Sequence, residues 1–305
     1  MASGDSEPVR IVSGQNTKLT RVAHGITYDA GRDEIFASEP LASSVVAFRG
    51  GASGEAAPLA VIQGPKTRLH QPWGLQVDDL HKELVVADFA TSSILTYAWD
   101  ANGDVAPKRV IRGPETGMRG LSGLAVDPER NLIVGATFLG GKRGSRAAGP
   151  YSNSFGWGGG NGGLFIFDRT AQGNVAPRGV IAGPHTGIIA AAQVVVYGGK
   201  IFATIDNTKY MPPYDLGGYL PRQGCKGPPL PPLTMGSADN FVGVWNITDN
   251  GDVPPMAIIH GPATQLVAPA GIAINPKAGE LYITDGGVNG AFTFLVPQFF
   301  SLAAK

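Results

Sequence analysis

The phrase PLAVIQGPKT (residues 58–67) decides the fold, together with the three phrases that follow it: GLQVD (74–78), ELVVA (83–87) and SILTY (93–97). Each phrase is short, rich in β-branched residues, and bounded by Gly, Pro, Asp or Asn. That pattern is typical of a β-strand between tight turns. The four phrases together therefore predict a unit of four short strands.

This unit recurs along the whole chain. The first phrase occurs five times, and its copies end on Gly14, Gly64, Gly113, Gly183 and Gly261. Four short strands repeated about every 50 residues are typical of β-propeller blades. We therefore predict an all-β chain that forms a β-propeller of five four-stranded blades. A sixth, degenerate blade within the two longer intervals is the alternative.

The ends of the chain predict how the propeller closes. The chain opens with an outer-strand phrase, PVRIVSG (8–14), and its last phrases stop just short of one. The N-terminal strand is therefore expected to complete the last blade, which removes an exposed sheet edge. We predict a single domain over residues 1–305, with long rim insertions at about 138–163 and 207–240.

Two stretches carry a family resemblance, one from Gly74 to Asp88 and one from Gly271 to Asp285. Their phrasing, G[IL]xVD…ELxVAD, resembles the NHL-type propeller repeat. The same broad lineage includes virginiamycin B lyase-like, SMP-30-like lactonase and strictosidine synthase-like proteins, usually with six or seven blades. The resemblance implies a propeller with lyase, lactonase, cyclase or binding activity. None of the catalytic patterns of these families transfers to this chain residue by residue.

Composition narrows the classes of function. The formal net charge is zero, so no basic surplus exists to neutralise nucleic-acid phosphates. Cys225 is the only cysteine, which excludes an intrachain disulfide and a CxxC metal pair. No run of residues approaches 18 apolar positions, and the N-terminus has no apolar signal core. We expect a soluble protein, cytoplasmic or secreted if a signal was removed, with no membrane or nucleic-acid partner.

The two insertions are predicted to share one rim. Antiparallel strand order places the connections between second and third strands on the same rim as those between blades. Both insertions are connections of the first kind, and long loops of this sort usually carry function. Their aromatic residues either roof an apolar pocket or pack the loops onto the propeller: Tyr151, Phe155, Trp157, Tyr210 and Tyr214.

Two further sets of residues are expected at this rim. The first lies at the start of the innermost strands and just upstream of them: His24, His70, Gln71, Trp73, Arg119 and Ser122. The second lies at the ends of the second strands: Glu39, Asp88, Asp206 and Asp285.

These residue types suit acid/base chemistry. His24 titrates near neutral pH, and clustered carboxylates shift one another's pKa or recruit a cation. Asp88 and Asp285 are candidate ligands for Ca²⁺ or Mg²⁺, whereas Arg119 and Gln71 would orient a ligand. Each carboxylate also fits a turn cap that accepts backbone N–H bonds. The cofactor prediction is therefore none, or a divalent cation.

Two functions follow from this reading. The first is an enzyme that acts on a small, fairly apolar molecule by acid/base or metal-assisted chemistry, such as elimination, cyclisation or lactone-type ring opening. His24, Glu39, Asp88, Asp206 and Asp285 are its candidate catalytic residues. The alternative is a non-catalytic propeller that binds a ligand or a protein. A small-molecule partner is predicted, and a protein partner is left open.

Overall fold

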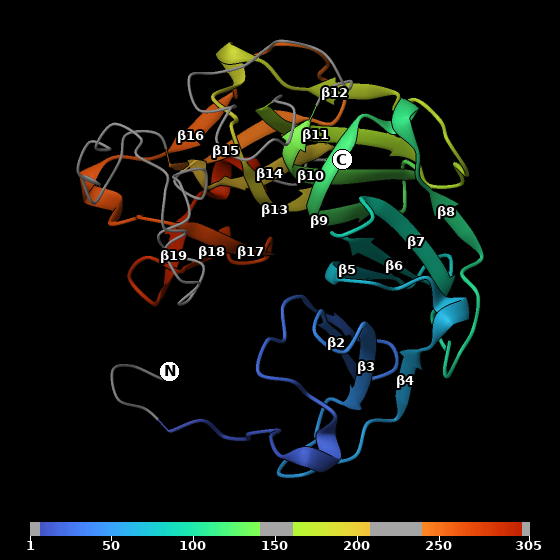
Figure 1. Ribbon diagram of the computed structural model, residues 1–305. Helices are drawn as coiled ribbons and strands as arrows, with labels where there is room; N and C mark the ends of the chain where they lie inside the picture. Colours follow the sequence, from blue (N-terminus) through green and yellow to red (C-terminus); the bar gives the residue numbers. More distant parts are fainter. Residues whose placement is uncertain (1–6, 141–160, 208–239, 301–305) are drawn as a thin grey trace, which may run out of the picture. The chain divides into compact units, whose positions relative to one another are not determined.

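A computed structural model describes residues 7–140, 161–207 and 240–300 (Figure 1). The strands form five antiparallel sheets in chain order, so the chain is a five-bladed β-propeller, as its repeat predicts. The first blade contains β1 (Ile26–Asp29), β2 (Glu34–Glu39), β3 (Ser44–Arg49) and β4 (Ala60–Gln63). The second contains β5 (Pro72–Asp78), β6 (Glu83–Asp88), β7 (Ser93–Ala98) and β8 (Arg109–Ile111).

The remaining three sheets follow the same order of strands. The third contains β9 (Met118–Asp127), β10 (Leu132–Gly140), β11 (Asn161–Asp168) and β12 (Gly179–Ile181). The fourth contains β13 (Ala191–Tyr197), β14 (Lys200–Ile205), β15 (Phe241–Asn246) and β16 (Ala257–Ile259). The fifth contains β17 (Pro269–Asn275), β18 (Glu280–Asp285) and β19 (Gly290–Leu295). The two insertions connect β10 to β11 and β14 to β15, and most of their residues lie outside the described ranges.

By their internal contacts, the residues group into two compact units. The first comprises Met1–Gly135 with Ile166–Arg178, and the second comprises Ala136–Phe165 with Gly179–Lys305. The first unit has an apolar core that includes Phe36, Leu84 and Tyr97. The second has a core that includes Phe202 and Leu281. The single-domain prediction stays a prediction.

Helical structure in the described residues is limited to short 3-10 turns, and none of it is long and apolar enough to cross a membrane. Five of these turns are the Gly-Pro-x-Thr phrases and their N-terminal variant. In the second copy, the Thr67 hydroxyl donates to the Gly64 carbonyl at 2.6 Å and accepts from the Leu69 N–H at 3.2 Å. Gly64 has a φ of 130°, which favours glycine. The same hydroxyl bridge occurs at Thr17, Thr116, Thr186 and Thr264.

Three of these turns are also held by the blade that follows them. Asp104, in the turn between β7 and β8, accepts a hydrogen bond from the Lys66 N–H at 2.7 Å. Asn174 does the same for the Glu115 N–H, and Asp252 does the same for the His185 N–H. Isolated bridges join the outer strands to the same turns: Ile62 with Gly103, Ile111 with Gly173, and Ile181 with Gly251. Neighbouring blades are thus linked through one recurring contact.

The N-terminal segment makes this recurring contact too. Val12 bridges Gly54 in the turn between β3 and β4, and Asn16 donates to Glu55 in that turn at 3.1 Å. The segment from Pro8 therefore lies against the first blade as an outer strand of a preceding blade would. The fifth sheet has three strands among the described residues. Its completion by the N-terminal strand stays a prediction.

The hydroxyl bridge can be tested at Thr67, which is fully buried. Thr67→Val keeps the shape of the side chain but leaves the Gly64 carbonyl and the Leu69 N–H without this partner. We expect the free energy of unfolding to fall by about 1–3 kcal/mol in denaturant titrations. Thr67→Ser, which keeps the hydroxyl, is the control. Equal stability of the Val and Ser variants would contradict the bridge.

Closure can be tested with a disulfide. In the first, second and fourth blades, the residue equivalent to Val12 pairs with the second residue of the third strand: Ile62 with Val45, Ile111 with Ile94, and Ile259 with Val242. The same register predicts that Val12 pairs with Ala291. In a Cys225→Ser background, Val12→Cys with Ala291→Cys should oxidise to a disulfide, detected by loss of free thiols. Ile11→Cys with Ala291→Cys is the control, because adjacent strand residues face opposite sides. No disulfide, or equal cross-linking of both pairs, would refute the closure.

Candidate functional site

Three stacked aromatic rings lie at the edge of the first two blades, within the first unit. The rings of His24 and Trp73 are parallel to within 16°, with centroids 4.3 Å apart. The rings of Trp73 and Phe89 are parallel to within 15°, with centroids 4.0 Å apart. His24 is exposed, and the other two residues are half-buried. We call these three residues the aromatic stack.

Ser38, in β2, positions two members of the stack. Its hydroxyl donates to the Trp73 carbonyl at 2.7 Å and accepts from the Gly25 N–H at 2.8 Å. Its carbonyl accepts from the His24 N–H at 3.0 Å. A side chain at Gly25 would collide with the Trp73 carbonyl, so the close approach of the two backbones requires glycine here. The buried hydroxyl therefore fixes the spacing of the His24 and Trp73 backbones.

Asp88 ends β6 directly before Phe89, and its carboxylate is fully buried. One oxygen accepts from the N–H groups of His70 and Gln71, each at 2.7 Å. The other accepts from the N–H and the hydroxyl of Thr91, at 3.0 and 2.7 Å. These four bonds make Asp88 a cap that ties the connection before β5 to the end of β6. The same bonds hold the backbone shortly before Trp73, at His70 and Gln71, and shortly after Phe89, at Thr91.

Asp285 and Glu39 occupy equivalent positions in their blades. Asp285 accepts from the N–H groups of Val267 and Ala268 in the connection before β17, and from those of two residues that follow it. One Glu39 oxygen accepts from both the N–H and the hydroxyl of Thr20, at 2.8 and 2.6 Å. The other Glu39 oxygen is buried without a hydrogen-bond partner. The three carboxylates thus share a capping geometry, which Glu39 completes only in part.

The fourth blade corrects the register given to Asp206. β14 ends at Ile205, which pairs with Ala191 as Asp88 pairs with Pro72 in the second blade. Asp206 lies one residue further on and is fully buried. Asn207 takes the capping role, because its side-chain oxygen accepts from the Ile189 and Ala190 N–H groups at 2.9 and 3.0 Å. By strand pairing the equivalent of Asp88 is Ile205, so in this blade the cap comes from a residue two positions further along the chain.

The structure places the other predicted residues as follows. His70 is exposed, Gln71 and Arg119 are half-buried, and Ser122 is buried in β9. Phe89 was missed, although an aromatic residue directly after the last strand residue was a usable signal. The predicted aromatic residues of the insertions all lie outside the described ranges: Tyr151, Phe155, Trp157, Tyr210 and Tyr214.

Metal binding was predicted at Asp88 and Asp285. Within the described ranges, no group of three or more His, Cys, Asp or Glu side chains is arranged to hold a metal ion. Both oxygens of Asp88 and of Asp285 accept from N–H or O–H donors, which is the geometry of a turn cap, and metal binding by these residues stays a prediction. The catalytic and binding roles predicted for the rim residues stay predictions.

Comparison with known proteins supports the fold. No family model matches the chain, and no curated protein sequence matches it. The structure of hydrazine synthase from Kuenenia stuttgartiensis is similar, with a TM-score of 0.56 and 14% identity over 92% of this chain and 67% of that one. A chain of the nidogen/laminin complex is similar with a TM-score of 0.57 and 12% identity, over 93% of this chain and 79% of that one. These likenesses agree with a β-propeller and concern the fold alone.

The capping role of Asp88 can be tested by Asp88→Asn. The amide has one acceptor oxygen, and its NH₂ group would face N–H donors. We expect the free energy of unfolding to fall by about 1.5–3 kcal/mol, measured by chemical denaturation. Asn207→Asp is the matched control: its carboxylate keeps the two acceptor contacts but loses the bond from the Asn207 amide to the Gly187 carbonyl, at 2.9 Å. An Asp88→Asn variant as stable as the wild type would contradict the cap.

Proposed function

We propose that this propeller binds a flat, largely apolar small molecule on the aromatic stack. The observation that carries the proposal is the parallel alignment of His24, Trp73 and Phe89. Aromatic groups prefer offset stacking at such separations, so a planar ligand gains by stacking with these rings. Rigid backbone bonds at Ser38 and Asp88 order this surface before a ligand arrives, which lowers the entropy cost of binding.

The hydrogen bonds of the carboxylates support binding over acid/base chemistry. A catalytic carboxylate must exchange a proton with its substrate, and its oxygens must be accessible to do so. Asp88 and Asp285 are buried, and both oxygens of each accept from backbone donors. In this interpretation they shape the rim and do not react.

Catalysis on a small molecule is the second candidate function. It is favoured by Glu39, whose second oxygen is buried and lacks a hydrogen-bond partner. Glu39 directly follows Ser38, whose carbonyl accepts a hydrogen bond from the His24 N–H. The carboxylate and the imidazole therefore lie on hydrogen-bonded neighbouring segments. Kinship with the NHL-type lineage would add lyase, lactonase or cyclase chemistry. The similar structures include an enzyme, hydrazine synthase, and a protein complex, nidogen/laminin, and so favour neither candidate.

Ligand binding can be tested with a panel of planar aromatic fragments and matched saturated analogues, followed by NMR titration of the ¹⁵N-labelled protein. We expect the planar fragments to bind and to shift the indole signal of Trp73. Trp73→Leu should weaken binding at least tenfold. His24→Ala should weaken it by about 2–10-fold, the contribution of one stacked ring pair. Trp99→Phe is the control, because Trp99 contacts Arg32 and Lys82 and no member of the stack.

The same experiment separates the two candidates. A bound fragment recovered unchanged supports a binding propeller. Conversion of a fragment, lost in His24→Gln and Glu39→Gln while its affinity remains, would establish the enzyme. Fragments that bind the Trp73→Leu variant as well as the wild type would overturn the proposed site.

A further inference from the structure

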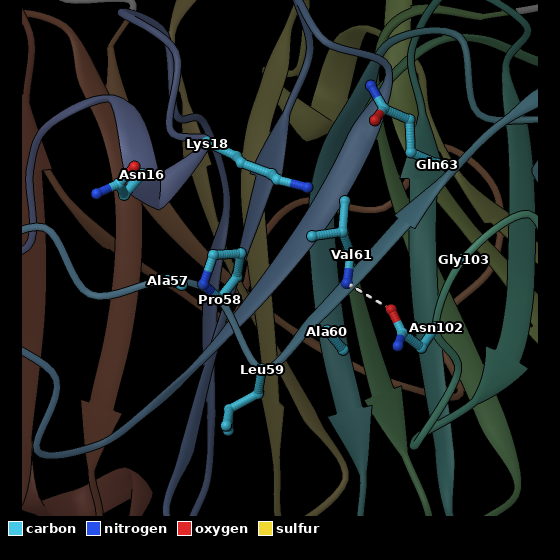
Figure 2. Close-up of a pocket in the computed structure, with 10 residues that line it drawn as sticks. All are labelled: Asn16, Lys18, Ala57, Pro58, Leu59, Ala60, Val61, Gln63, Asn102 and Gly103. Carbon is cyan, nitrogen blue, oxygen red and sulfur yellow. Dashed lines mark hydrogen bonds between the residues drawn. The ribbon is translucent and has the colours of Figure 1, made fainter.

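Two grooves in the first unit occupy equivalent positions in successive blades. The first has a volume of about 490 Å³ and lies beside β4, where its lining includes Lys18, Leu59, Gln63 and Asn102 (Figure 2). The second has a volume of about 330 Å³ and lies beside β8. Each is bounded by an outer strand and by the turn of the next blade that bridges this strand. The repeat thus builds the same groove twice.

The charge of the two grooves differs. The second groove has cations at four positions: Arg68, Lys108, Arg109 and Arg112. The equivalent positions of the first groove hold Lys18, Leu59, Ala60 and Gln63. The third repeat has Gly117, Arg178, Gly179 and Ala182 at these positions, and the fourth has Gly187, Met256, Ala257 and His260. A geometry common to the blades therefore carries a cationic cluster beside β8 that its equivalents lack.

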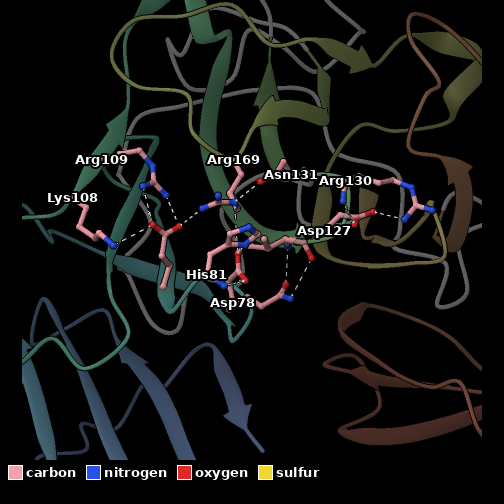
Figure 3. Close-up of polar contacts among 11 residues, drawn as sticks. Asp78, His81, Lys108, Arg109, Asp127, Arg130, Asn131 and Arg169 are labelled. Carbon is pink, nitrogen blue, oxygen red and sulfur yellow. Dashed lines mark hydrogen bonds and ion pairs between the residues drawn. The ribbon is translucent and has the colours of Figure 1, made fainter. Parts of the chain in front are cut away.

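Glu83 neutralises only part of this cluster. Figure 3 shows Lys108, Arg109 and Arg169 among the polar contacts beside the groove. Arg109 binds the Glu83 carboxylate through both terminal nitrogens, at 2.8 and 2.5 Å, and Lys108 lies 3.4 Å from it. The buried Arg169 also contacts Glu83, at 2.6 Å, and lies 3.8 Å from Asp78. Burial raises the pKa of Glu83, but the hydrogen bonds and charges of Arg109, with those of Arg169 and Lys108, hold that pKa below its usual range. Glu83 is therefore ionised at neutral pH.

The local charge balance is positive. Three cations, Lys108, Arg109 and Arg169, lie against the carboxylates Glu83 and Asp78, while Arg68 and Arg112 are exposed at the groove. The Glu83 carboxylate fixes the orientation of Arg109, which removes much of the entropy cost of presenting that guanidinium. The opposite wall is rigid as well, because the Arg112 N–H donates to the Gly173 carbonyl at 3.0 Å and the Gly173 N–H donates to the Val110 carbonyl at 2.7 Å.

We propose that the groove beside β8 binds a phosphate or sulfate group carried by a small molecule. Guanidinium groups match the geometry of tetrahedral oxyanions and bind them through paired, charge-assisted hydrogen bonds. The volume of about 330 Å³ falls at the lower end of the range for small-molecule sites. This site is separate from the aromatic stack, so it stands or falls independently of the proposed function.

The test is calorimetric titration with sodium phosphate and, separately, sodium sulfate, at constant ionic strength in chloride. We expect saturable binding of at least one of the two anions to the wild-type protein, and their relative affinities indicate which ester to seek. Arg68→Gln with Arg112→Gln should raise the dissociation constant at least tenfold, because the variant removes the two exposed guanidinium groups. Lys18→Gln, at the position equivalent to Arg68 in the first groove, should leave it unchanged.

Thermal unfolding would verify that each variant is folded. If the double variant does not fold, Lys108→Gln replaces it, because the Lys108 side chain is 48% exposed and its removal leaves the Arg109–Glu83 pair intact. Absence of saturable binding to the wild type would overturn the proposal. Equal affinity of the wild type and the groove variant, or equal weakening by Lys18→Gln, would overturn it as well.

Discussion

The structure depends on the turn that carries the chain from one blade to the next. Its threonine hydroxyl closes the turn from within, as at Thr67, and a side chain from the following blade binds it from outside, as Asp104 does at the Lys66 N–H. Blades have no covalent link other than the chain, so their mutual order rests on packing and on contacts of this kind. A buried hydroxyl with two partners is costly to remove, which makes the turn a fixed point for the residues after it.

These turns also determine where the residues of the rim lie. The residues after each turn run to the innermost strand and are held there by the side chain that ends the second strand, as His70 and Gln71 are held by Asp88. The carboxylates that composition suggested as reactive groups are therefore part of the framework. Their burial and their donor partners explain how Trp73 and Phe89 are held face to face on short connections.

Much of the fold could be predicted from the sequence, because the repeat encodes the strands and turns of each blade. The five-bladed fold and the position of both insertions follow from phrase spacing, because strand length and turn chemistry are local properties. Asp206 was assigned to the end of the second strand, but Ile205 holds that position by strand pairing, and Asn207, two residues after Ile205, provides the cap. The stack unites residues 16 to 65 positions apart in the sequence, and the cationic groove unites Arg68 with residues as distant as Gly173, so only the packing of blades shows them.

The repeat also separates what the fold requires from what it leaves free. A threonine recurs in all five turns, and a capping side-chain oxygen follows the second strand in four of the blades. The position before the glycine of the innermost strand holds His24, Trp73, Ser122, Ala192 and Ala270 in turn, so the framework places no demand on it. The outer groove varies in the same way, from Leu59 and Gln63 in one blade to Lys108 and Arg112 in the next. At such a position the backbone is the same in every blade, so a residue that differs from its equivalents can provide a functional group without being needed for folding. By this criterion, the aromatic stack and the cationic groove, both in the first two blades, are the features to test first.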